Sequence, residues 1–140
     1  MAAEYILALD YGSKRVGVAI AHTIARLPRP VTTLPNNETL LADIAKMVAA
    51  ENVGQVLVGL PRGMDGGYTE QTREAESFAT QLAHAITVPV ELADETLTSV
   101  DAESALGGTR YDKAEVDALA ATYILERYLT EHPASLEENR

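Results

Sequence analysis

The chain has 140 residues, of which 46% are hydrophobic, so one domain of this length can bury a core without disulfides or a structural metal. It has no cysteine, which excludes a disulfide framework and a cysteine zinc site. It also has no apolar stretch approaching the roughly 20 residues of a membrane-spanning helix, so we expect a soluble, cytoplasmic protein without membrane attachment. Its formal net charge of −10 argues against a general polyanion binder, although the Lys and Arg residues gather in predicted turns and leave room for a local basic rim.

Hydrophobic periodicity predicts alternating strands and helices after three leading strands. Apolar runs bounded by turn residues predict strands over 5–10, 15–21, 31–34, 55–60 and 88–93. Apolar residues at helical spacing predict helices from an Asn37 N-cap to about 51, from about 75 to 86, and over 114–129. A capping box at Thr98 predicts a further short helix that ends at Leu106. The order β-β-β-α-β-α-β-α indicates an α/β fold, a mixed five-stranded sheet with helices on its faces.

Three acidic residues stand at unusual places in this pattern. Asp10 ends the first strand, Glu95 directly follows the last strand, and Asp117 lies in the last helix beside its apolar stripe. If the first and last strands are neighbours, Asp10 and Glu95 converge at one end of the sheet, and the last helix can bring Asp117 over them. Such a trio is a hard-oxygen site for Mg²⁺ or Mn²⁺. Two such ions about 3.5–4 Å apart would activate water and stabilise the leaving oxygen of a phosphodiester.

Each acid also has an ordinary interpretation. Asp10 can open a turn, Glu95 can be a solvated loop charge, and Asp117 can sit in a first helical turn favoured by the helix dipole. The spacing alone does not decide between these interpretations and a metal site.

The sequence resembles the YqgF (RuvX) family of pre-16S ribosomal RNA nucleases, which are also described as Holliday-junction-resolvase-like. The resemblance covers about residues 5–129 and rests on five motifs in the family's order and spacing: LALDYGSKRVGVAIA, VLVGLPRGMDG, the FA of 78–79, DETLTS and VDALAATYILERYL. It implies a ribonuclease H-like fold, with one nuclease domain over 1–130. The segment 131–140 is acidic and interrupted by proline, so we expect it to be a flexible tail. The resemblance also implies that Asp10, Glu95 and Asp117 bind divalent metal and activate water for phosphodiester hydrolysis.

The turn after Asp10 gains a role from the same resemblance. Gly12 permits the turn, and Lys14 and Arg15 are placed to meet the substrate backbone; the alternative is a solvated hairpin tip. Gly17, in the strand that follows, would allow a close approach of another backbone.

Two departures from the family pattern bear on activity. Thr96 stands where the family has an arginine after Asp-Glu, so Arg62 and Arg110 become candidate substitutes for a phosphate-binding cation. Junction resolvases carry a second aspartate three residues before the position of Asp117, where this chain has Ala114. The missing carboxylate favours RNA hydrolysis over robust junction cleavage.

We therefore expect a metal-dependent nuclease acting on RNA in the 5′-end maturation of pre-16S ribosomal RNA. Structured or junction DNA is an alternative substrate, since the residues do not distinguish RNA from DNA. A nucleic-acid or ribosome-assembly binding module without turnover is the alternative function, favoured by Thr96 and the acidic composition. The sequence leaves a monomer and a homodimer open.

Overall fold

A computed structural model describes residues 5–61, 67–94 and 113–132 and confirms the predicted order of elements. The predicted short helix over 98–106 lies outside these residues. The elements are β1 (Tyr5–Tyr11), β2 (Arg15–His22), β3 (Arg29–Pro35), α1 (Leu40–Ala50), β4 (Val53–Leu60), α2 (Glu70–Ala85), β5 (Val90–Asp94) and α4 (Lys113–Glu131).

The five strands form one mixed sheet in the order β3-β2-β1-β4-β5. β1 pairs antiparallel with β2, and β2 with β3, whereas β4 runs parallel to both β1 and β5. The predicted mixed sheet is thus confirmed, but β1 and β5 are not neighbours. β4 lies between them because its second half is buried on both faces, which suits a central strand, whereas the partly exposed β5 takes the edge.

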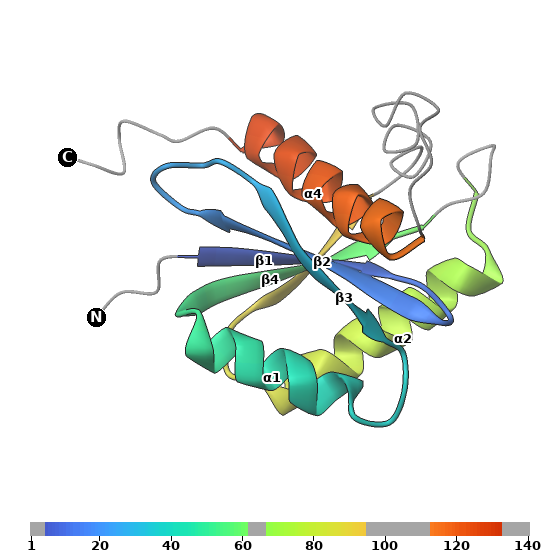
Figure 1. Ribbon diagram of the computed structural model, residues 1–140. Coiled ribbons are helices and arrows are strands. Elements are labelled where there is room, and N and C mark those ends of the chain that lie inside the picture. Colours follow the sequence, from blue (N-terminus) through green and yellow to red (C-terminus); the bar gives the residue numbers. More distant parts are fainter. Residues whose placement is uncertain (1–4, 62–66, 95–112, 133–140) are drawn as a thin grey trace.

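The two faces of the sheet are covered by different helices, as Figure 1 shows, with α4 on one side and α1 and α2 on the other. Alternate residues of β1 divide between the two cores because side chains of a strand alternate in direction. Leu7 and Leu9 pack in the core with α1 and α2, and Ile6 and Ala8 pack in the core with α4. An even-numbered position of β1 therefore faces α4.

Two helix starts differ from the prediction. α1 begins at Leu40 with Thr39 as its N-cap, because the Asn37 side chain accepts hydrogen bonds from the Thr39 amide and hydroxyl at 3.0 and 2.8 Å in a turn before the helix. α2 begins at Glu70, about five residues before its predicted start, because Thr69 and Thr72 form a reciprocal capping box. The buried Thr72 hydroxyl also donates to the Pro61 carbonyl and ties α2 to the end of β4.

The C-terminal end of α4 is held by the turn between β2 and β3. Arg26, which has a φ of 56°, donates through Nη2 to the carbonyl oxygens of Leu129 and His132 at 2.9 and 2.5 Å. A cation at a helix C-terminus satisfies carbonyls that have no partner within the helix. The helix consequently extends to Glu131, two residues past its predicted end.

Candidate functional site

The site forms where α4 crosses β2 at Gly17. A Cβ atom at Gly17 would lie 2.0 Å from the Asp117 carbonyl oxygen, so only glycine allows the helix backbone to come this close. Gly17 is also the partner of Asp10 in the β1–β2 register. Asp10 occupies an even position of β1, on the face that α4 covers, so Asp10 and the backbone of Asp117 both lie next to Gly17. The predicted close approach at Gly17 is confirmed, and the approaching backbone is α4.

Arg15 forms an ion pair with Asp117. Its Nε atom donates to Oδ2 of Asp117 at 2.7 Å, and the two side chains are 36% and 24% exposed. Within the described part of the chain, Arg15 is the cation that contacts Asp117. The residue predicted to meet the substrate therefore contacts a candidate metal ligand in the free protein.

The turn before Arg15 is braced from β3. A Cβ at Gly12 would lie 2.7 Å from the Arg15 carbonyl oxygen, so glycine is needed here for space. Asn36 donates through Nδ2 to the Gly12 carbonyl at 2.7 Å and through its amide to the Lys14 carbonyl at 2.9 Å. Lys14 is exposed, as a phosphate-binding residue must be. Asn36 was not anticipated from the sequence, although its type and its place after Pro35 are typical of a turn.

Tyr11 faces away from this site. Its ring stacks on Phe78 of α2 with centroids 4.7 Å apart, in the core on the opposite side of the sheet. Tyr11 is therefore a packing residue and does not present its ring to a base.

Glu95, Thr96, Arg62 and Arg110 lie outside the described residues. The strand that precedes Glu95 is parallel to β4, as β1 is, so the C-terminal ends of β1 and β5 lie at the same edge of the sheet. With β4 between them, those ends are about two strand spacings apart, roughly 9–10 Å. Among the described residues no group of three His, Asp or Glu side chains could hold a metal ion.

The described carboxylates nevertheless suit a hard divalent cation. Asp10 and Asp117 come from a strand and from a helix whose backbones are held together at Gly17, so both are carried by rigid elements. Mg²⁺ is commonly bound by one or two carboxylates together with water and substrate phosphates. The donor set therefore fits the ion that the sequence resemblance implies.

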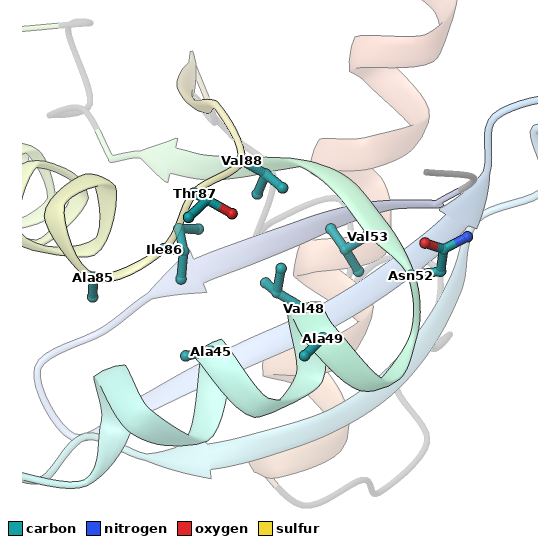
Figure 2. A pocket seen from close by; sticks show the side chains of 9 residues that line it. All are labelled: Ala45, Val48, Ala49, Asn52, Val53, Ala85, Ile86, Thr87 and Val88. Atoms are coloured by element: carbon teal, nitrogen blue, oxygen red, sulfur yellow. The ribbon is translucent and has the colours of Figure 1, made fainter. Parts of the chain in front are cut away.

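A hollow of about 360 Å³ lies elsewhere, at the N-terminal ends of β4 and β5. Figure 2 shows its lining side chains between α1 and the segment that joins α2 to β5. The lining residues are Ala45, Val48, Ala49, Asn52, Val53, Ala85, Ile86, Thr87 and Val88. None of these side chains titrates, so the hollow lacks groups for hydrolysis and stands apart from the two carboxylates.

A pKa shift occurs away from the site, on α2. Arg73 donates a side-chain hydrogen bond to the Glu70 carboxylate, and this bond, together with the negative charge of Glu70, raises the pKa of Arg73. Arg73 is paired within its own helix and is remote from Asp10 and Asp117 in the fold.

None of the described helices is long and apolar enough to cross a membrane.

The fold is that of the Holliday junction resolvases. The structure of RuvC from Thermus thermophilus superposes with a TM-score of 0.56 at 12% identity, covering 91% of this chain and 96% of RuvC. The Fowlpox virus resolvase, solved with Holliday junction DNA, gives a TM-score of 0.53 at 13% identity, covering 94% of this chain and 99% of the resolvase. These likenesses confirm the expected ribonuclease H-like fold.

The family follows from closer similarity in sequence. The model of the RuvX family, described as Holliday junction resolvase, matches residues 4–131, and the chain belongs to this family. A protein of Chloroflexus aggregans is 41% identical over 132 residues, and the aligned region covers 90% of this chain and 93% of that protein. A protein of Dechloromonas aromatica is 42% identical over 129 residues, covering 88% of each. Both are named "Putative pre-16S rRNA nuclease".

Proposed function

We propose that this protein is a divalent-metal-dependent nuclease that hydrolyses RNA phosphodiester bonds in the 5′-end maturation of pre-16S ribosomal RNA. The observation that carries the proposal is that Asp10 and the backbone of Asp117 both lie next to Gly17, in a chain whose relatives are named for pre-16S rRNA nuclease activity. The fold shared with junction resolvases supports phosphodiester hydrolysis as the type of reaction.

In this proposal Asp10, Glu95 and Asp117 are the ligands of Mg²⁺ or Mn²⁺. Two ions held by these residues would provide an activated water and stabilise the departing 3′ oxygen. The chain's own part is to hold the carboxylates in place before metal arrives. β1 and α4 do so for two of them, because the contact at Gly17 sets the distance between their backbones.

The substrate side is formed by the turn that follows β1. Gly12 and its bond from Asn36 fix the turn, and exposed Lys14 is free to approach a phosphate. We assign Arg62 and Arg110 to the same phosphate backbone as replacements for the cation missing at Thr96. We place the activity in the cytoplasm, where ribosomal RNA precursors are processed.

The proposal is tested by incubating the purified protein with single-stranded RNA, single-stranded DNA and a four-way junction, each with Mn²⁺ or Mg²⁺. We expect cleavage of RNA that needs metal and falls at least a hundredfold in Asp10→Asn, because the substitution removes a ligand charge. Asp43→Asn is the matched control, since Asp43 lies on α1, across the sheet from α4. Equal cleavage by Asp10→Asn would contradict the assigned site.

A binding module without turnover is the second candidate. The net charge of −10 and Thr96 in place of an arginine favour it, because both reduce the positive charge available to a substrate. The same experiment separates the two functions: well-folded protein that binds RNA but cuts none of the substrates is a binding module. Junction cleavage is expected to be weak, because Ala114 lies one helical turn before Asp117, where junction resolvases carry a second aspartate, and alanine supplies no carboxylate.

A further inference from the structure

We propose that Arg15 is a resident counter-ion of Asp117 that competes with the divalent metal for this carboxylate. The inference rests on the proposed function, since it takes Asp117 to be a metal ligand. It assigns Arg15 a second role besides substrate contact: it sets the metal concentration at which the site fills.

The geometry of the pair makes competition unavoidable. Nε of Arg15 lies 2.7 Å from Oδ2 of Asp117, which is the distance of a charge-assisted hydrogen bond. A cation that binds through Asp117 must share this carboxylate with the guanidinium or displace it. Because Arg15 and Asp117 are 36% and 24% exposed, solvent screens their attraction only in part, and a divalent ion can overcome it.

The backbone of Asp117 does not need Arg15 to reach its position. Its carbonyl oxygen rests against Gly17, at a distance that admits no side chain, and this contact fixes the backbone of α4 over β2. Removing the guanidinium therefore leaves the backbone of Asp117 in place and takes away a positive charge beside its carboxylate. The expected effect on metal affinity is a gain, because repulsion between two cations disappears while the ligand stays.

Neighbouring Lys14 provides a matched comparison. It carries the same charge one residue earlier, but its side chain is exposed, and the hydrogen bond that fixes it goes to its backbone carbonyl. A charge in that position is screened by water and salt. Lys14→Gln therefore reports the loss of one nearby charge without the loss of a contact to Asp117.

The test is a titration of the full, metal-stripped chain with Mn²⁺, in which the dissociation constant is measured for the wild type, Arg15→Gln, Arg15→Lys, Lys14→Gln and Asp117→Asn. We expect Arg15→Gln to bind Mn²⁺ roughly threefold to tenfold more tightly than the wild type. Arg15→Lys keeps the charge and should stay within about twofold, as should Lys14→Gln. Asp117→Asn should lose most of the affinity.

A purely structural ion pair would give a different result. Arg15→Gln would then melt a few degrees lower without metal, as expected for a partly exposed pair, and its Mn²⁺ affinity would match the wild type. Unchanged or weaker Mn²⁺ binding by Arg15→Gln overturns the inference, and so does equal tightening in Lys14→Gln.

The outcome is separable from that of the proposed function. Mn²⁺ binding that depends on Asp117 and tightens in Arg15→Gln supports the inference even if the wild type cuts no RNA, in which case the nuclease proposal alone fails. RNA cleavage with equal Mn²⁺ affinity in the wild type and Arg15→Gln overturns the inference alone. Mn²⁺ binding that Asp117→Asn leaves intact overturns the metal site and the inference together.

Discussion

The residue on which the site depends has no side chain. Gly17 is the partner of Asp10 across the β1–β2 pairing, and it lies directly under the carbonyl of Asp117. A helix packed on a sheet is normally held off by the side chains between them, which would keep the two carboxylates apart. The glycine removes that spacer at one point and so sets the distance between the two carboxylate-bearing backbones.

Gly17→Ala should therefore damage both stability and the site. The new Cβ would lie 2.0 Å from a backbone oxygen, which cannot rotate away as a side chain could, so α4 must shift. We expect a loss of about 1–3 kcal/mol in the free energy of unfolding, the usual cost of overpacking, measured by urea denaturation. Mn²⁺ affinity should fall as well, because the shift separates Asp117 from Asp10.

Gly12→Ala is the natural comparison, since its Cβ would also meet a backbone oxygen, at 2.7 Å, but within a turn where relaxation is easier. Its loss of stability should be the smaller of the two. Equal stability of Gly17→Ala and the wild type would show that α4 does not rest on β2 at this residue.

At this scale the sequence predicted individual residues better than their partners. Asp10 was singled out because it ends an apolar strand, and Asp117 because it lies in the last helix beside the apolar stripe. Arg15 was expected to face a substrate, and its contact with Asp117 was missed because the two residues are 102 positions apart. Such a pair depends on where α4 docks, and no local pattern records that.

At the scale of elements, α4 is fixed near both ends by β2 and its loops. Gly17 receives the backbone at Asp117, and Arg26 binds the carbonyls of Leu129 and His132 at the other end. Two anchors more than two helical turns apart define the direction of the helix across the sheet. The angle at which Asp117 meets the sheet is therefore also set by a turn far from the carboxylates.

Arg26→Met tests this second anchor. Methionine keeps an apolar stem of similar length but cannot donate to the two carbonyls, so the last turn of α4 should fray. We expect a loss of about 1–2 kcal/mol in the free energy of unfolding, from urea denaturation, since a cation at a helix C-terminus and its hydrogen bonds are worth that much.

The control is Arg29→Met, an exposed arginine three residues further along the same hairpin. It should change the free energy of unfolding by less than about 0.5 kcal/mol, as surface substitutions usually do. If both variants lose the same stability, the bonds from Arg26 to α4 contribute nothing specific.

Element types were predictable from periodicity, whereas helix starts were not. Asn37 is a good N-cap by type, but its side chain bonds to Thr39 instead and delays α1. Thr69 and Thr72 cap α2 through a threonine pair, where the familiar capping box has Glu or Gln at the third helical position. Competing caps within three residues differ too little in free energy for sequence alone to choose between them.

At the scale of the whole molecule, the order of strands decides which carboxylates can share a metal. Strand patterns predicted five strands but did not predict that β4 separates β1 from β5. That order follows from how completely each strand is buried, which emerges only once the sheet has assembled. The separation leaves room for more than one cation between the end of β1 and the end of β5, in keeping with the two-metal site proposed here.

The charge of the whole molecule limits how it can bind RNA. With a net charge of −10, attraction must come from a few cations, for which we propose Lys14, Arg15, Arg62 and Arg110. Binding weakens as salt rises, because each phosphate contact releases counterions. Four phosphate contacts to a single strand predict a slope of about −3 for the logarithm of the association constant plotted against the logarithm of salt concentration. Fluorescence anisotropy with a labelled RNA at several salt concentrations measures it.

Lys14→Gln should reduce the magnitude of that slope by about 0.7, the contribution of one phosphate contact. Arg29→Gln should leave the slope unchanged, because Arg29 lies at the end of β3 remote from the turn that follows β1. In the β2–β3 register Arg29 pairs with Ile20, whereas Arg15, next to that turn, pairs with Pro35 at the other end. A slope steeper than about −5 in the wild type would require more phosphate contacts than these four residues supply. RNA would then have to cross a different face of the protein, and the assignment of the turn after β1 to the substrate would be wrong.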